Sequence, residues 1–354
     1  MSILELILGG GYKSVAVVGM AKNTGKTTTL NHMIKEAAAS GGGQVMLGLI
    51  TAGRDGEKTD ILTNLPKPVI VAPTGALFAT AEQVLPRCEA RLELVEDTAY
   101  ITQLGRVSIY RVEEAGAVEL VGPDTAGQLR HIIRRMRDLG AALVLADGAF
   151  DRRASASPAI VEAAILATGA ALSPDMATTI AWTSMVARLL QLRRPADRRL
   201  EAAARKVIAE RRVAVIDTEY RTRYLDVGTA LGNADKVTRA VAATRTIEGA
   251  ECLALACGRS VTGEILTALT SKAADGRKVE LVVGDGTRLF VEPEEWRRFT
   301  AAGGRVTVLN PIRLLAVTVN PYSPVGPSYN PADFLAKVGR AVTPIPAFDL
   351  GRGP

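Results

Sequence analysis

The stretch VAVVGMAKNTGKTTTLNHMI, residues 15–34, limits the fold of this chain more than any other. An apolar run, residues 15–18, ends at Gly19, and the string Gly25-Lys26-Thr27 follows after five intervening residues. A helical pattern then continues to Ala39 and stops at three glycines. A continuously apolar run, a glycine-rich loop and a helical pattern are typical of a buried parallel strand and its following helix. The stretch therefore predicts a strand–loop–helix unit of an α/β fold.

The loop of this unit has the residue types of a phosphate-binding loop, with one residue more than the common Gly-x4-Gly-Lys-Ser/Thr form. Backbone N–H groups at the start of a helix attract an anion, and the helix dipole adds to that attraction. We expect Lys26 to contact the β- and γ-phosphates and Thr27 to bind Mg²⁺. A glycine-rich turn with an incidental lysine is the structural alternative. The predicted nucleotide-binding residues are Gly19, Asn23, Thr24, Gly25, Lys26, Thr27 and Thr28.

Acidic residues that follow two other apolar runs are candidates for a metal anchor. Asp147 comes directly after the strand expected over residues 143–146, and Asp55 lies in a glycine-flanked loop after the strand expected over residues 45–50. Either acid could instead be an ordinary loop or turn residue. The predicted metal ligands are Thr27, Asp55 and Asp147, and the predicted catalytic residues are Lys26, Asp55 and Asp151. A solvated surface role is an equal alternative for Asp151 and for Lys22.

Apolar runs alternate with helical patterns along most of the 354 residues. This alternation predicts an α/β fold with a doubly wound, mostly parallel sheet, as in P-loop NTPases. Residues 105–122 alternate apolar and polar side chains around Glu-Glu-Ala-Gly, which predicts an inserted β-hairpin. Strands are expected at 14–18, 45–50, 69–72, 143–146, 213–216, 252–257, 281–283, 306–309 and 314–319, and helices at 27–39, 126–139, 159–166, 175–192 and 293–302.

The arginine-rich stretch 193–212 is the expected domain boundary. Residues 1–195 would form the nucleotide-binding domain, and residues 196–354 either a second α/β unit or a continuation of the same sheet. The chain has a net charge of +6, but acidic residues interrupt the arginines and aromatic residues make up only 4%. A solvated helix face is therefore expected there rather than a nucleic-acid surface.

The composition also indicates the cellular compartment in which the protein is expected. Three cysteines make neither a disulfide framework nor a zinc set, and no apolar run reaches the ~18 residues of a membrane-spanning helix. The apolar N-terminus lacks the basic segment and cleavage pattern of a signal peptide. We therefore expect a reduced, cytoplasmic protein with no membrane partner.

The five-residue spacing of the loop and the ADGAF sequence at residues 146–150 resemble one branch of P-loop proteins. That branch includes dethiobiotin synthetase and the metallochaperone GTPases. Members with a second, signature lysine carry it four residues before the glycine of Gly-Lys-Thr, where this chain has Ala21. No Asn/Thr-Lys-x-Asp string for guanine recognition follows a predicted strand. ATP is therefore expected in preference to GTP.

Four segments together resemble a single family: GMAKNTGKTTTLN (19–31), LGLITAGRDGE (47–57), LADGAFDRRASASPAIVEAAILATGA (145–170) and VTVNPYSPVGPSYNPADFL (317–335). The family is that of the phosphate-loop subunit of the reactivase for lysine 5,6-aminomutase, an adenosylcobalamin-dependent enzyme of amino-acid fermentation. The resemblance implies a helper that uses Mg-ATP hydrolysis to drive the exchange of damaged cobalamin. It also implies two partners, a second reactivase ATPase subunit and the aminomutase, and leaves the oligomeric state open.

Two other functions fit the same loop. One is an ATP-dependent small-molecule ligase or kinase of the dethiobiotin synthetase type, in which Asp55, Lys22 and the Asp151-Arg152-Arg153 cluster could serve an anionic substrate. The other is a binding module that holds a nucleotide without hydrolysing it. We expect this chain to be an NTP hydrolase.

Overall fold

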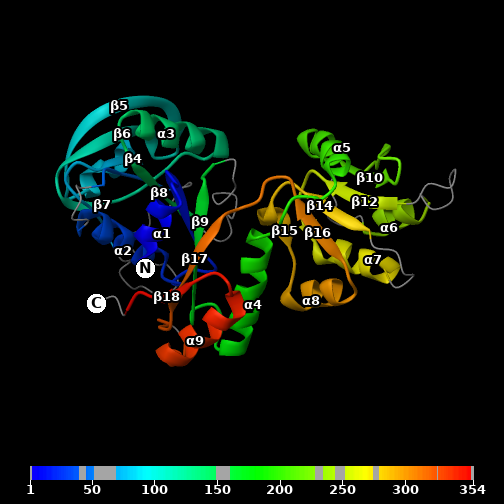
Figure 1. Cartoon of the computed structure of the whole chain (residues 1–354). Coiled ribbons are helices and arrows are strands. Elements are labelled where there is room, and N and C mark those ends of the chain that lie inside the picture. The colour runs from blue at the N-terminus through cyan, green and yellow to red at the C-terminus, as the bar shows by residue number, and fades with distance from the viewer. Residues whose placement is uncertain are drawn as a thin grey trace. The chain divides into compact units, whose positions relative to one another are not determined.

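The computed structural model describes residues 2–39, 45–51, 69–148, 160–227, 234–243, 252–273, 279–324 and 326–351. The chain divides into two compact units (Figure 1). Unit 1 comprises Met1–Ser184 and Arg313–Pro354, and unit 2 comprises Met185–Ile312. This division differs from the predicted 1–195 and 196–354. The C-terminal segment belongs to unit 1 because β17 (Leu314–Asn320) pairs with β9 (Ala163–Gly169) of the first sheet.

Unit 1 is built on a nine-stranded sheet in the order β18-β17-β9-β1-β8-β2-β4-β6-β5. The seven strands from β18 to β4 are parallel, and β6 and β5 are antiparallel to their neighbours. The predicted α/β class with a mostly parallel sheet is therefore confirmed. The bounds of the other strands are β1 (Ser14–Gly19), β2 (Leu47–Thr51), β4 (Leu77–Ala81), β5 (Arg91–Thr102), β6 (Gly105–Glu114), β8 (Leu143–Gly148) and β18 (Ala347–Asp349).

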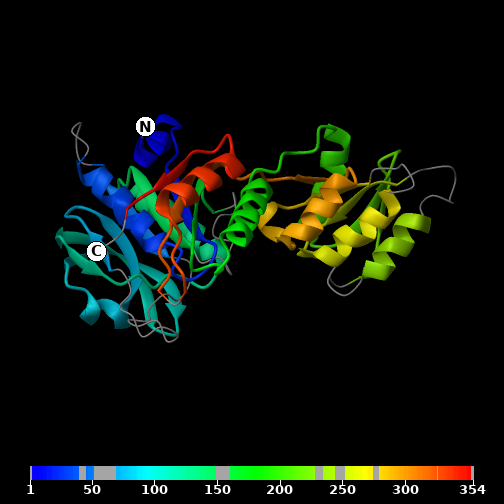
Figure 2. The same cartoon turned by 90° about the horizontal axis from the view of Figure 1, so that it is seen from below.

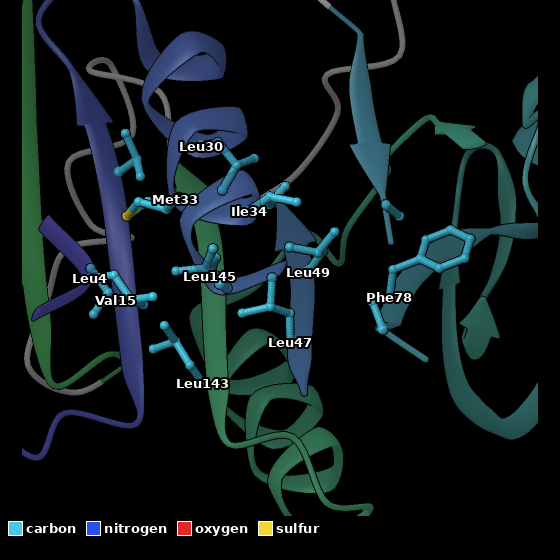
Figure 3. Close-up of a cluster of buried hydrophobic side chains, with 14 of the residues drawn as sticks. Leu4, Val15, Leu30, Met33, Ile34, Leu47, Leu49, Phe78, Leu143 and Leu145 are labelled. Atoms are coloured by element: carbon cyan, nitrogen blue, oxygen red, sulfur yellow. The ribbon is translucent and has the colours of Figure 1, made fainter. Parts of the chain in front are cut away.

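Helices cover both faces of this sheet. On one face, α2 (Lys26–Ala39) packs Leu30, Met33 and Ile34 toward apolar side chains of β1, β2 and β8 (Figure 3). The short helix α1 (Ile3–Gly9), which begins with a Ser2–Glu5 capping box, joins the same core. On the other face lies α3 (Ala126–Asp138), whose Met136 Sδ would lie 3.1 Å from a Cβ atom on Gly48 of β2. The sheet is thus wound on two sides, as the alternating pattern predicts.

The helix predicted over residues 159–166 is wrong. Residues Ala163–Gly169 form β9, and every one of them is buried. β9 lies between β1 and β17, where it is paired on both edges. Alanine favours a helix in isolation, but small side chains also suit a central strand that is covered on both faces. Tertiary packing decides the outcome here.

The inserted β-hairpin exists, but its turn is not at the predicted Glu-Glu-Ala-Gly. β5 and β6 pair with each other, and Thr102 lies opposite Gly105 across the turn. Gly105 has φ +92°, a conformation that glycine adopts without strain. The segment after Glu114 leaves this pair: β7 (Gly116–Val118) pairs instead with β3 (Ile70–Ala72).

Two helices follow strands near the other end of the sheet. α4 (Met176–Leu190) comes after β9, and α9 (Pro331–Val342) comes after β17. They lie side by side in both views (Figures 1 and 2), and Ser184 Oγ donates to Ala341 O at 3.0 Å. The start of α9 is fixed by Asn330, whose side chain accepts from the backbone N–H of Asp333.

Unit 2 contains a smaller sheet in the order β11-β10-β12-β14-β16, with β12, β14 and β16 parallel. The arginine-rich stretch supplies α5, whose Leu200, Ala204 and Val207 pack on this sheet. None of the helices in the described ranges has the length and apolar character needed to cross a membrane. The elements of unit 2 are α5 (Arg198–Ala209), β10 (Val213–Asp217), β11 (Thr222–Tyr224), α6 (Ala234–Ala243), β12 (Cys252–Cys257), β13 (Val261–Thr262), α7 (Gly263–Ala273), β14 (Glu280–Val283), β15 (Leu289–Phe290), α8 (Pro293–Ala301) and β16 (Arg305–Val308).

Candidate nucleotide-binding site

The loop between β1 and α2 lies at the carboxyl edge of the unit 1 sheet. β1 has β8 on one side and β9 on the other, and all three strands are parallel. The next strand in the chain, β2, lies on the far side of β8, whereas β9 and β17 lie on the opposite side of β1. Open parallel sheets bind ligands at such a reversal of strand order, outside the carboxyl ends of the strands. The predicted phosphate loop therefore lies where a ligand is expected.

Two residues of this loop have left-handed backbone conformations. Asn23 has φ +61° and Gly25 has φ +91°. Between them, Thr24 is 1% exposed, and its hydroxyl donates to Ala21 O at 2.9 Å. At the start of the loop, Met20 N donates to Ala167 O of β9 at 2.9 Å. The loop is thus a fixed turn held at several points.

A side chain would collide with a neighbour at Gly19, and at Gly25 the backbone conformation (φ +91°) would be strained for any other residue. A Cβ atom at Gly19 would lie 2.5 Å from Cγ of Lys26, because the lysine side chain passes over this glycine. A Cβ atom at Gly25 would lie 3.1 Å from Cβ of Asn320. Both predicted glycines are therefore needed for the observed path of the loop and of Lys26.

Lys26 and Asp147, which are far apart in the chain, come together at the end of β8. Lys26 Nζ lies 3.8 Å from Asp147 Oδ1, and the two side chains are 16% and 8% exposed. Asp147 pairs in register with Val17 of β1 and Thr51 of β2, so it stands between these two strands. The Thr51 hydroxyl donates to Asp147 O at 3.3 Å. A cation and a carboxylate thus share a largely buried position beside the loop.

The first turn of α2 carries four consecutive polar residues, Lys26 to Thr29. Thr27 and Thr28 are half-buried. Thr29 is buried, and its hydroxyl donates to Gly25 O at 2.9 Å. The same hydroxyl also lies 2.8 Å from that of Thr318 on β17. Thr29 therefore ties the first turn of the helix to the loop and to a strand beyond β9.

Asn320, at the end of β17, contacts the loop and was not among the predicted site residues. Its Nδ2 donates to Asn23 O at 2.9 Å. The signal in the sequence was an asparagine directly after a predicted apolar strand, which is where the polar residues of a parallel sheet collect. Nothing local indicated that this strand would lie only one strand away from β1.

Two predicted residues, Asp55 and Asp151, lie outside the described residues. Lys22 is exposed. Within the described ranges, no group of three His, Cys, Asp or Glu side chains is arranged to hold a metal ion. Of the three predicted metal ligands, the structure thus describes Thr27 and Asp147.

Comparison of the chain with models of protein families, with curated proteins and with solved structures gives no match. A glycine-rich turn, the start of a helix, a lysine and a buried carboxylate are the groups that can hold the phosphates of a nucleotide and a divalent cation.

Proposed function

We propose that this chain binds a nucleoside triphosphate with Mg²⁺ at the loop of residues 19–28 and hydrolyses it, with ATP preferred to GTP. The observation that carries the proposal is the meeting of Lys26 and Asp147 at 3.8 Å beside that loop. At the carboxyl edge of a parallel sheet, a buried carboxylate can hold a divalent cation while the neighbouring lysine contacts the phosphates of a nucleotide.

Each residue of the site has a role under this proposal. The loop N–H groups and the start of α2 bind phosphate oxygens, and Lys26 neutralises charge on the β- and γ-phosphates. Thr27 and Asp147 are suited to hold Mg²⁺, since hydroxyl and carboxylate oxygens are ligands that it accepts. Bound Mg²⁺ would stabilise the negative charge that develops during phosphoryl transfer. Asp55 and Asp151 remain the proposed residues for orienting the attacking water.

The narrower proposal is a helper of an adenosylcobalamin-dependent aminomutase. It rests on the family resemblance of the four sequence segments. In this function, the helper acts together with a second ATPase subunit. Nucleotide hydrolysis opens the inactivated mutase so that damaged cobalamin can leave. Such an opening requires that the two nucleotide states of the helper bind the mutase with different affinity.

The test is phosphate release from Mg-ATP by the purified protein, alone and with an inactivated aminomutase and the second reactivase subunit. We expect slow hydrolysis by the protein alone, faster hydrolysis with the partners, and recovery of mutase activity that requires hydrolysable ATP. A competition titration with GTP should give weaker binding than with ATP.

Two results would redirect the assignment. A rate that no such partner changes, together with fast conversion of a small acid or amine, favours the ligase or kinase. Tighter binding of GTP than of ATP would move the chain toward the metallochaperone GTPases.

A further inference from the structure

We propose that Asn320 is a positioning residue that holds the phosphate loop in its binding conformation from a strand that does not adjoin it. This inference rests on the proposed nucleotide site. Asn320 is the last residue of β17, which is separated from β1 by β9. Its side chain nevertheless contacts the loop at Asn23, and its Cβ would lie 3.1 Å from a Cβ atom placed on Gly25.

The hydrogen bond from Asn320 fixes the direction of one peptide group in the loop. Asn320 Nδ2 donates to Asn23 O at 2.9 Å. A trans peptide is planar, and its C=O and N–H point in opposite directions. The N–H of Thr24 therefore points away from Asn320. We assign this N–H to the phosphate-binding face of the loop, so that Asn320 keeps a donor aimed at the ligand.

The same bond offsets the cost of the backbone conformation at Asn23. A residue other than glycine at φ +61° has a strained backbone conformation, which persists only where the surrounding structure fixes it. Asn tolerates this region better than most residues. The hydrogen bond from Asn320 supplies the outside support for this conformation. A Cβ atom placed on Gly25 would lie only 3.1 Å from Asn320 Cβ, so glycine suits the loop position that faces Asn320.

Asn320 is itself held firmly, which a positioning residue requires. Its backbone O accepts from Ala170 N at 2.9 Å, and a Cβ atom at Gly169 would lie 2.5 Å from that oxygen. Its Oδ1 accepts from Tyr322 N at 3.2 Å. Both ends of the side-chain amide are therefore used, one toward the loop and one toward the segment that follows β17.

A second polar contact runs parallel to the first. Thr318 is two residues before Asn320 and so lies on the same face of β17. Its hydroxyl lies 2.8 Å from that of Thr29, the buried residue that donates to Gly25 O. β17 thus braces the site at two levels, the loop through Asn320 and the first turn of α2 through Thr318.

The experiment compares the affinities of wild type, Asn320→Ala and Asn320→Asp for Mg-ATP and for Mg-tripolyphosphate, measured by calorimetry. Tripolyphosphate lacks the nucleoside, so it reports on the loop alone. Loss of one positioning hydrogen bond should weaken both ligands alike, by about three- to tenfold in Asn320→Ala. Asn320→Asp keeps the shape but replaces the donor by a carboxylate, so it should weaken both ligands further.

Asn310→Ala is the matched control, because Asn310 Nδ2 also donates to a backbone carbonyl, Gly284 O at 3.2 Å, but does so in unit 2. It should leave both affinities unchanged. Circular dichroism of each variant reports whether it is folded, and Asn320→Asp decides the question if Asn320→Ala does not fold.

The outcomes separate the two proposals. Wild-type affinity of a folded Asn320 variant for tripolyphosphate overturns the positioning role and leaves the nucleotide site standing. A variant that binds ATP more weakly but binds tripolyphosphate as the wild type does also overturns the positioning role, because Asn320 would then contact the nucleoside part. Failure of the wild type to bind either ligand overturns the proposed function, and the positioning role with it.

Discussion

Lys26 at the start of α2 and Asp147 near the end of β8 bring a cation and a carboxylate to within 3.8 Å of each other beside the loop of residues 19–28. The sequence predicted both from local patterns, Lys26 from the glycine-rich loop that ends in Gly-Lys-Thr and Asp147 from its place directly after an apolar run. Asn320 also follows such a run, but its contact with Asn23 depends on the order of strands in the sheet. Strand order is set by long-range packing, and no local pattern in the sequence reports it.

Lys26→Ala should lower nucleotide affinity or turnover by at least about tenfold, or ~1.4 kcal/mol, because it removes the cation expected at the β- and γ-phosphates. The measurements are a binding titration and phosphate release with Mg-ATP. Lys337→Ala is the control, because it removes a lysine from an exposed pair with Asp333 on α9. Turnover equal to that of the wild type in the Lys26 variant would contradict the phosphate-loop assignment.

Asp147→Asn should reduce hydrolysis by weakening the hold on Mg²⁺, while nucleotide binding without the metal should change much less. The variant keeps the size of the side chain and removes its charge. The measurement is the dependence of phosphate release on Mg²⁺ concentration, which should shift to higher concentration. If the Mg²⁺ dependence is the same as that of the wild type, Asp147 does not hold Mg²⁺ and is only a polar residue near the end of β8.

Individual strands and helices were predictable where one local signal dominated. β12 matches its predicted bounds, and α2 begins one residue before the predicted start. β9 was mistaken for a helix because alanine favours helices, whereas its burial between two strands is a property of the whole sheet. The β5–β6 hairpin was misplaced because the alternating pattern put its turn at Glu-Glu-Ala-Gly, whereas the turn precedes Gly105. Gly116 instead pairs with β3, a long-range contact that the local pattern does not report.

Gly105→Val should destabilise unit 1 by about 1–3 kcal/mol, because φ +92° is strained for a β-branched residue. The new Cβ would also lie 2.6 Å from the side chain of Glu82. The measurement is thermal unfolding. Gly127→Ala is the control, since Gly127 lies in α3 and a Cβ atom there meets nothing within 4 Å. An unchanged unfolding temperature for Gly105→Val would mean that the turn has a different backbone conformation.

The contact between β5 and α3 should make stability depend on pH. Hydrogen bonds from the Arg135 guanidinium lower the pKa of Glu96 below its ordinary value. Since this pKa is lower in the folded chain than in the unfolded chain, the carboxylate stabilises the fold above the ordinary value. That stabilisation is lost as the pH falls through the lowered pKa.

Glu96→Gln should therefore be less stable than the wild type at neutral pH, and the difference should shrink as the solution is acidified. The measurement is the free energy of unfolding in urea across this pH range. Glu93→Gln, at an exposed acid of the same strand, is the control for loss of a charge. A difference that stays constant with pH would show that the ion pair contributes nothing.

At the scale of the whole molecule, the described parts of the proposed site all belong to unit 1. The loop of residues 19–28, Asp147 and Asn320 come from chain segments before and after unit 2. The sequence indicated a boundary near the arginine-rich stretch and left open whether residues 196–354 form a second unit or continue the first sheet, whereas the structure divides them between the two. The return of the chain to the first sheet depends on parallel pairing between β17 and β9, which are separated by the whole of unit 2.

Hydrogen exchange should report this division directly. Mg-ATP should slow the exchange of backbone amides around the loop, the end of β8 and the end of β17, because a ligand protects the state that binds it. Amides in the core of unit 2, such as those of β12 and β14, should exchange at unchanged rates. Protection confined to Met185–Ile312 would contradict the proposed site, because it would place the bound nucleotide in unit 2.

The position of β17 in the chain has a consequence for biosynthesis. The ribosome completes β1, α2 and β9 before it begins unit 2, and β17 emerges only afterwards. During that interval the edge of β9 that later pairs with β17 is unpaired. Unpaired strand edges can pair with other chains and so promote aggregation. The carbonyl of Asn23 also waits for its hydrogen bond from Asn320. The last strands to be translated therefore both cover the edge of β9 and complete the contacts of the loop of residues 19–28, so a prematurely terminated chain should be prone to aggregation and should lack the proposed site.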